Sequence, residues 1–188
     1  MKRALDVSVS VLLLVLCLPI LLITIVAIRL QSPGGAIFRQ TRVGKNGLPF
    51  TCYKLRTMYA GTANLPTHEV ASLSVTPLGR YLRQFKIDEL PQLWNVLAGD
   101  MSLVGPRPCL PSQTELVEAR RRLGVFEISP GITGLAQVNC IDMSDPNRLA
   151  EIDAQYARTQ SLIGDLRLLL ATLRGQGVGV DQIIPSRK

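Results

Sequence analysis

The chain of 188 residues has few of the side chains that bind zinc or form disulfides. It contains one histidine, His68, and four widely separated cysteines without a CxxC pair, namely Cys17, Cys52, Cys109 and Cys140. A structural zinc site needs clustered cysteine and histidine ligands, and a disulfide framework needs a denser set of cysteines. We therefore expect neither, and the length suits one domain with its own core.

Acidic residues are almost absent from the N-terminal third. Residues 1–56 hold eight Lys or Arg and only Asp6 as an acid, whereas residues 57–188 hold thirteen of each sign. The whole net charge of +7 therefore arises near the N-terminus. A nucleic-acid surface is one interpretation, but this segment carries no recognisable nucleic-acid-binding motif and includes a membrane-length apolar run. We expect it to face anionic lipid and to bind no nucleic acid.

Charge is also absent from residues 7–28, VSVSVLLLVLCLPILLITIVAI. This run matches the roughly 20 residues that span a bilayer, and it lacks a signal-peptide cleavage pattern. Pro19 favours a kink in its middle, and basic residues on both sides, Lys2 and Arg3 before and Arg29 after, give no clear direction. A spanning helix and a re-entrant helix bent at Pro19 both fit these residues, and a buried soluble helix fits them less well.

The rest of the sequence predicts a mostly helical α/β fold with a small β-hairpin. Residues 36–40 and 49–56 are typical of strands, and the Asn46-Gly47 pair between them favours a hairpin turn. Helices are expected over residues 78–85, 91–98, 114–123 and 161–174, with a further helix after Asp145-Pro146. The helix over 161–174 is apolar nearly all round, as in a core or interfacial helix.

Two expectations concern the helix over 114–123. Ser112 and Glu115 have the spacing of a capping box at its start. The run Arg120-Arg121-Arg122 predicts a helix surface that faces solvent or lipid headgroups, with a catalytic role as the less favoured alternative.

Two adjacent carboxylates, Asp88 and Glu89, precede Pro91 in KIDELPQLWNV, residues 86–96. Acids near a helix start are favoured by the macrodipole, so a simple helix cap is one interpretation. The other is a nucleophile, because a carboxylate can attack phosphorus to form an acyl phosphate. Such chemistry commonly uses Mg²⁺ bound by carboxylates and substrate phosphates.

Candidate phosphate-binding cations are present as well. Strand alternation places Lys54 and Arg56 on one face, either as solvated charges or as a pair that converges on an anion. Arg107 lies between Pro106 and Pro108 in a stiff loop, where its guanidinium suits phosphate binding, although a rigid surface turn also explains the pattern. Together with the acids, these residues indicate metal-assisted phosphoryl transfer at a membrane.

Four sequence blocks together resemble the bacterial sugar transferase family, the monotopic phosphoglycosyl transferases. They are the segment from Lys2-Arg3 through Asp6 to Pro19, SPGGAIFRQTRVGKNGLPFTCYKLRTM (32–58), KIDELPQLWNVLAGDMSLVGPRP (86–108) and PGITGLAQVN (130–139). The resemblance implies that residues 1–32 form a re-entrant membrane helix broken at Pro19. It implies that residues 33–188 form a cytosolic catalytic domain with interfacial amphipathic helices, on the bacterial inner (cytoplasmic) membrane with the active site facing the cytoplasm.

The resemblance also implies an activity. It is the transfer of a phospho-sugar from a UDP-sugar to polyprenyl (undecaprenyl) phosphate with release of UMP, the first membrane step of glycan assembly. Asp88 would attack the sugar-bearing phosphate and form a covalent phospho-sugar enzyme, and Glu89 would complete the dyad. Mg²⁺ would be the cofactor, and a homodimer is allowed. The implied metal-binding residues are Asp88, Glu89 and Asp165, and the implied phosphate-binding residues are Lys54, Arg56, Arg83 and Arg107.

The sequence departs from the family pattern at two places. Ser129 replaces a usual Arg, and Cys140-Ile141 replace a usual Gly-Arg, from which we expect a distinct donor sugar. Two other functions fit the same residues. One is a membrane-anchored, Mg²⁺-dependent phosphohydrolase or nucleotidyl enzyme, and the other is a non-enzymatic scaffold in which the acids only cap a helix.

Overall fold

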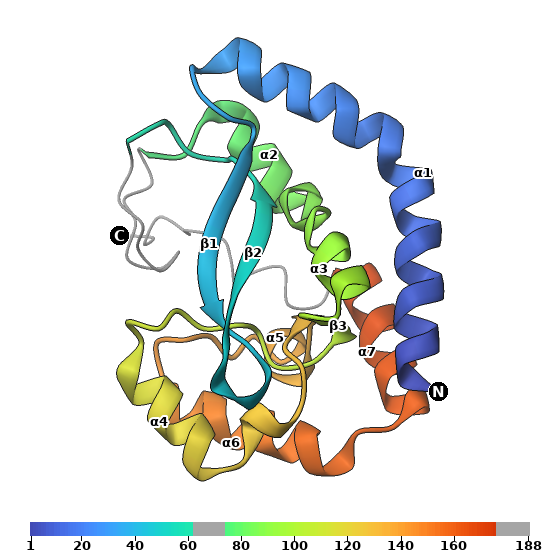
Figure 1. Ribbon diagram of the computed structural model, residues 1–188, viewed down its shortest axis with the longest axis vertical. Coiled ribbons are helices and arrows are strands. Elements are labelled where there is room, and N and C mark those ends of the chain that lie inside the picture. Colours follow the sequence, from blue (N-terminus) through green and yellow to red (C-terminus); the bar gives the residue numbers. More distant parts are fainter. Residues whose placement is uncertain (62–73, 176–188) are drawn as a thin grey trace.

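The computed structural model describes residues 1–61 and 74–175, so the loop predicted over residues 60–76 lies mostly outside the described residues. The described part is mostly helical, with two two-stranded sheets. Figure 1 shows a β-hairpin through the centre, α2 and α3 on the side of the hairpin toward α1, and α4 and α6 at the end where the hairpin turns. The helices are α1 (Lys2–Gln31), α2 (Pro77–Gln84), α3 (Gln92–Ala98), α4 (Thr114–Arg122), α5 (Leu135–Val138), α6 (Pro146–Thr159) and α7 (Leu162–Leu173).

Helix α1 contains Pro19 and is the one helix of the described residues that is long and apolar enough to cross a membrane. It continues past the proline but bends along its length (Figure 1), as expected where proline removes a backbone hydrogen bond. The helix is therefore continuous across Pro19, and a kink located at the proline itself stays a prediction.

The polarity of α1 is the reverse of that of a helix in a water-soluble protein. Polar side chains, Asp6, Ser10 and Thr24, are among its few buried residues and face the rest of the protein. Large apolar side chains face outward, among them Leu12, Val15, Leu16, Leu22 and Ile23. An exposed apolar surface of this extent is typical of a site that contacts a membrane or another protein.

Both ends of α1 are attached to the same domain. At its start, Lys2 Nζ donates to Asp165 Oδ2 at 2.5 Å, and the Asp6 carboxylate accepts from Ser102 Oγ at 2.9 Å. Beyond its end, the guanidinium of Arg56 donates to the carbonyls of Ser32 and Pro33 at 2.7 and 2.6 Å. Arg56, which the sequence predicts as a phosphate ligand, thus fixes the two residues that follow α1.

The predicted hairpin is confirmed. Strands β1 (Ile37–Val43) and β2 (Pro49–Leu55) pair antiparallel, with Gln40 opposite Cys52, so β1 extends three residues beyond the prediction. The turn η1 (Lys45–Gly47) places Asn46 at φ 58°, the left-handed conformation that asparagine tolerates.

The helices expected over residues 78–85 and 91–98 are present as α2 and α3, within one residue at each end. Between them, Lys86 adopts φ 55° and reverses the chain into the short 3₁₀ turn η4 (Ile87–Glu89). Gly99 ends α3 at φ 97°, a conformation that glycine adopts without steric cost.

Strands β3 (Ser102–Val104) and β4 (Gly131–Thr133) form a short parallel pair that the sequence did not predict. It brings the loop that contains Arg107 beside the start of the fourth sequence block, where Gly131 N donates to the Pro106 carbonyl at 2.8 Å. The backbones approach so closely that a Cβ on Gly131 would overlap the backbone nitrogen of Gly105.

In the C-terminal half, Asp145 caps α6 and Ser161 caps α7 with their side chains, and α6 confirms the helix expected after Asp145-Pro146. The predicted capping box is wrong. Gln113 is the N-cap of α4 without a side-chain cap bond, and Glu115 Oε1 accepts instead from Asn147 Nδ2 of α6 at 3.1 Å.

Close packing of β3 on β4 generates a stability prediction. Gly131→Ala should lower the free energy of unfolding by about 3 kcal/mol, because the added Cβ has no space between the strands. Gly35→Ala is the control, since its Cβ would meet only Ile37 O at 3.9 Å. Thermal unfolding in detergent, followed by circular dichroism, measures both. Equal effects of the two substitutions would contradict the prediction.

Candidate active site

Asp88 and Glu89 lie together on η4, immediately before α3. Only 7% of Asp88 and 5% of Glu89 is exposed, although a helix-capping acid usually stays in contact with water. The expected position at a helix start is confirmed, because both acids lie in the first turn of η4. Solvated helix caps alone do not account for this burial, since burying an ionised carboxylate is costly unless charged or hydrogen-bonding partners surround it.

Glu89 is surrounded by such partners. Lys54 Nζ from β2 and Arg107 Nη2 from the loop after β3 both donate to its Oε1, at 2.7 and 3.0 Å. Two of the predicted phosphate-binding cations therefore converge on Glu89 of the dyad, and the companion of Lys54 there is Arg107 rather than Arg56, with which strand alternation paired it.

The electrostatics of Glu89 follow from this arrangement. Burial alone would raise the pKa of Glu89, but the charges of Lys54 and Arg107 and the hydrogen bond from Lys54 hold the pKa well below its usual range. Glu89 is consequently a carboxylate at any physiological pH. It neutralises part of the charge of two cations that would otherwise repel each other.

The other two predicted phosphate ligands have structural contacts. Arg56 binds the carbonyls beyond α1, and Arg83 Nε donates to Thr57 Oγ1 at 2.9 Å, just after β2. These contacts fix the N-terminal helix and the start of the segment after β2. A contact of either residue with phosphate stays a prediction.

The expectation that Asp165 joins Asp88 and Glu89 in one acidic cluster is wrong. Asp165 is buried at the start of α7, where its oxygens accept from Lys2 Nζ at 2.5 Å and from Tyr156 OH at 2.7 Å. It is fixed there because α7 packs beside the start of α1. Within residues 1–61 and 74–175, no three His, Cys, Asp or Glu side chains gather into a metal site.

The expectation of an exposed arginine surface on α4 is wrong for Arg120, which is 1% exposed. Its Nε and Nη2 donate to Asp153 Oδ2 of α6 at 3.0 and 2.6 Å. The sequence held a signal for this position, because Arg120 follows the buried Leu116 by four residues and so lies on the core face of α4.

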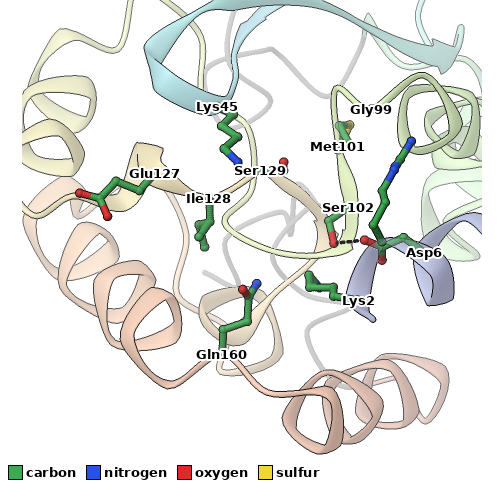
Figure 2. Close-up of a pocket in the computed structure, with 11 residues that line it drawn as sticks. Lys2, Asp6, Lys45, Gly99, Met101, Ser102, Glu127, Ile128, Ser129 and Gln160 are labelled. Atoms are coloured by element: carbon green, nitrogen blue, oxygen red, sulfur yellow. Dashed lines mark hydrogen bonds between the residues drawn. The ribbon is translucent and has the colours of Figure 1, made fainter.

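A pocket of about 270 Å³ opens at the start of α1 and β3 (Figure 2). Lys45 from the hairpin turn points into it toward Ser129, and Asp6 bonds Ser102 across its edge. None of Asp88, Glu89, Lys54 and Arg107 lines this pocket, so it is separate from the acidic dyad.

The fold and the site define a helix-rich protein with an apolar N-terminal helix and a buried, cation-paired acidic dyad, a site suited to phosphate chemistry. Comparisons with known proteins connect this chain to one family. A model of the bacterial sugar transferase family matches residues 1–176. The chain belongs to the bacterial sugar transferase family, which confirms the resemblance seen in the sequence blocks.

Three relatives show which proteins the chain is similar to. The chain is 43% identical to the UDP-glucose:undecaprenyl-phosphate glucose-1-phosphate transferase of Caulobacter vibrioides, covering 92% of this chain and 68% of that protein. It is 42% identical to the uncharacterized sugar transferase EpsL of Bacillus subtilis, covering 93% and 86%. It is 36% identical to the UDP-N-acetylgalactosamine-undecaprenyl-phosphate N-acetylgalactosaminephosphotransferase of Aeromonas hydrophila, covering 92% of this chain but only 43% of that protein.

The lowered pKa of Glu89 generates a prediction for stability in acid. Ionised Glu89 stabilises the folded state above the pKa of the unfolded chain, about 4.3, and this contribution is lost as the pH falls toward the lower folded pKa. The stability advantage of the wild type over Glu89→Gln should therefore be constant above about pH 5. Below about pH 4 it should shrink by up to about 1.4 kcal/mol per pH unit.

Denaturant unfolding of both proteins from pH 7 to pH 3 measures this difference. In a Lys54→Met background, which removes one of the two cations, the pH dependence should be weaker. An advantage that stays constant down to pH 3 would show that Lys54 and Arg107 do not hold Glu89 in its charged form.

Proposed function

We propose that this sugar transferase moves a phospho-sugar from a UDP-sugar to polyprenyl (undecaprenyl) phosphate, releasing UMP, as the first membrane step of glycan assembly. The observation that carries the proposal is the buried dyad beside Lys54 and Arg107. Relatives named as UDP-glucose and UDP-N-acetylgalactosamine sugar-phosphate transferases support the substrate class. The departures at Ser129 and Cys140-Ile141 are the reason to expect a donor sugar distinct from theirs.

The reaction has two steps. A carboxylate oxygen of Asp88 attacks the phosphorus that carries the sugar, an Asp88 oxygen–phosphorus bond forms, and the bond to the bridging oxygen breaks, so that UMP leaves with the electron pair. A phosphate oxygen of the polyprenyl phosphate then attacks the same phosphorus. The Asp88–phosphorus bond breaks, which regenerates the carboxylate and gives the polyprenyl diphosphate sugar.

Lys54 and Arg107 supply the positive charge that phosphoryl transfer requires. Guanidinium and ammonium groups stabilise the charge on the transferring phosphoryl oxygens most strongly when they are held in place before the reaction. The contacts of both groups with Glu89 hold them beside Asp88. We assign Glu89 the role of keeping these two cations in position.

The dyad also fits a Mg²⁺ cofactor. Mg²⁺ is usually held by one or two carboxylates and takes its remaining ligands from substrate phosphates and water. Asp88 and Glu89 are adjacent and both buried, so they are the residues that would hold it. When bound, the ion would neutralise charge on the diphosphate of the donor.

We infer that α1 is a re-entrant membrane helix. A straight helix of 30 residues is about 45 Å long, comparable to a whole bilayer, so a spanning helix would carry one end away from the domain. Lys2 and Asp6 at one end and the carbonyls of Ser32 and Pro33 at the other all bind the domain. The outward apolar side chains between these attachments support lipid contact, with both ends on the cytoplasmic face of the inner membrane.

Helix α7 supports the same membrane orientation. Its start is attached to the start of α1 through Asp165 and Lys2, and four of its apolar side chains are exposed to the surroundings. They are Ile163, Leu166, Leu170 and Leu173. An amphipathic helix of this kind binds at the level of the headgroups, where a polyprenyl phosphate presents its phosphate.

Wild-type protein in nanodiscs, given a panel of UDP-sugars and undecaprenyl phosphate, should release UMP and form a lipid diphosphate sugar. Asp88→Asn should lower this turnover by at least about 1,000-fold, because an amide is a poor nucleophile. Glu118→Gln, at an exposed position of α4, is the control and should keep wild-type turnover.

Acid-quenched wild-type enzyme with its donor should carry a mass adduct of one phospho-sugar on the peptide that contains Asp88. UMP release that proceeds without lipid acceptor and yields free sugar phosphate would instead identify a phosphohydrolase. Full turnover by Asp88→Asn would rule out Asp88 as the nucleophile.

Single cysteines at the two ends of α1 test its topology. In a background without Cys17, Cys52, Cys109 and Cys140, the variants Ala4→Cys and Gln31→Cys place thiols at exposed positions. Both should resist an impermeant maleimide in intact cells and react in inverted vesicles, as should Glu118→Cys in the domain. Labelling of the two ends from opposite sides would exclude re-entry.

A further inference from the structure

The loop that carries Arg107 is held by its carbonyl groups. Four consecutive carbonyls, those of residues 106–109, each accept a hydrogen bond, and the donors lie on three elements, β4, α4 and the end of β1. The donors are Gly131 N to Pro106 at 2.8 Å, Arg120 Nη1 to Arg107 at 2.8 Å, Arg42 Nη1 to Pro108 at 2.9 Å and Val43 N to Cys109 at 2.9 Å.

The sequence of the loop explains why two of the four donors are side chains. Pro106 and Pro108 have no backbone N–H, so this segment cannot take part in a regular ladder of reciprocal backbone bonds. It offers carbonyl acceptors, and a guanidinium is the side chain with several N–H donors in a rigid plane and no acceptor. Arginine is therefore the matching partner for a Pro-Arg-Pro segment.

Arg120 is itself fixed from the opposite side. Two of its N–H groups bind one carboxylate oxygen of Asp153, and its Nη1 points to the Arg107 carbonyl. Burial alone would lower the pKa of Arg120, but Asp153 outweighs burial and raises it. The guanidinium is charged and has one orientation that satisfies both partners.

Arg42 acts on the next carbonyl in the same way. Its Nη1 donates to Pro108, and its Nη2 donates to Gln40 Oε1 on the same face of β1. Burial, together with the nearby positive charge of Arg107, lowers the pKa of Arg42 to about 10, so it is still charged at neutral pH. Burying a second arginine beside Arg107 is costly, which indicates a specific role for it.

We propose that Arg120, fixed by Asp153, and Arg42, fixed by Gln40, are positioning residues that orient the Arg107 peptide so that its guanidinium meets Glu89 and the transferring phosphate. The proposal rests on the proposed function. Its physical basis is that a catalytic charge displaced by about 1 Å loses much of its effect on the transition state.

A double-mutant cycle with Arg107 tests the proposal. Arg120→Lys keeps the positive charge but cannot bind Asp153 and the Arg107 carbonyl with the same fork, so kcat should fall about 10- to 100-fold. Arg107→Ala should lower kcat about 100-fold or more. In the double variant, Arg120→Lys should add less than about threefold, because a positioning residue has no effect once the group that it positions is absent.

Arg121→Lys is the matched control, since Arg121 is the exposed neighbour on α4 and should leave kcat unchanged. Independent effects of Arg120→Lys and Arg107→Ala that multiply in the double variant would reduce Arg120 to a purely structural residue and overturn the proposal. If Arg120→Lys does not fold, Arg42→Lys and Gln40→Leu are each combined with Arg107→Ala in the same kind of double-mutant cycle, because Arg42 binds the Pro108 carbonyl and Gln40 holds Arg42.

A second readout separates this proposal from the proposed function. In ¹⁵N-arginine-labelled protein, the Nε–H resonance assigned to Arg107 by its loss in Arg107→Ala should shift or broaden in Arg120→Lys but not in Arg121→Lys. An unmoved resonance would overturn the positioning role even if turnover is present. A shifted resonance without turnover on any UDP-sugar would support the positioning role and reject the proposed reaction.

Discussion

The bridging of Glu89 Oε1 by Lys54 and Arg107 is the interaction on which the site depends. It joins three segments that are distant in sequence, namely β2, η4 and the loop after β3. Because an isolated buried charge is costly, each of these groups requires the others, and displacing one segment leaves buried charge without a partner. The dyad and its cations therefore form as a unit, with their positions set before any substrate arrives.

The same principle governs the attachment of the N-terminal helix. Asp6 and Lys2 are bound to Ser102 and Asp165 inside the protein, whereas the outward surface of α1 is apolar. Ion pairs and hydrogen bonds thus hold the ends of α1, and its middle presents apolar side chains outward. This division explains why one acid occurs in an otherwise acid-free third of the sequence, since Asp6 accepts from the backbone and side chain of β3.

The attachment of α1 and the candidate active site share one structural support. The Val104 carbonyl of strand β3 accepts hydrogen bonds from Lys2 Nζ and Tyr156 OH. The strand continues directly into the loop that presents Arg107. On its other side, β4 packs against it through close glycine contacts. A three-residue strand therefore connects the apolar N-terminal helix with the cation beside the dyad, which gives a physical reason for its complete burial.

The sequence by itself determined the elements that have local signals. The apolar run of α1, the Asn46-Gly47 turn, the helices α2 and α3 and the position of the acids before Pro91 all follow from periodicity, turn chemistry and helix-end preferences. Local patterns also gave the two acids and the cations Lys54 and Arg107 as candidates, and the family blocks added the role of each. These features depend on residues within a few positions of one another, so the chain order is sufficient to find them.

Only the tertiary structure decided which distant groups meet. Strands of three residues are too short for a periodic pattern, so the pairing of β3 with β4 could not be predicted. Arg120 is buried because Asp153 on another helix compensates its charge, and Asp165 binds Lys2 because α7 begins beside α1. Charged side chains lie at the surface unless a partner compensates the cost of burial, so the partner that packing brings within hydrogen-bonding distance decides which of them lie in the core.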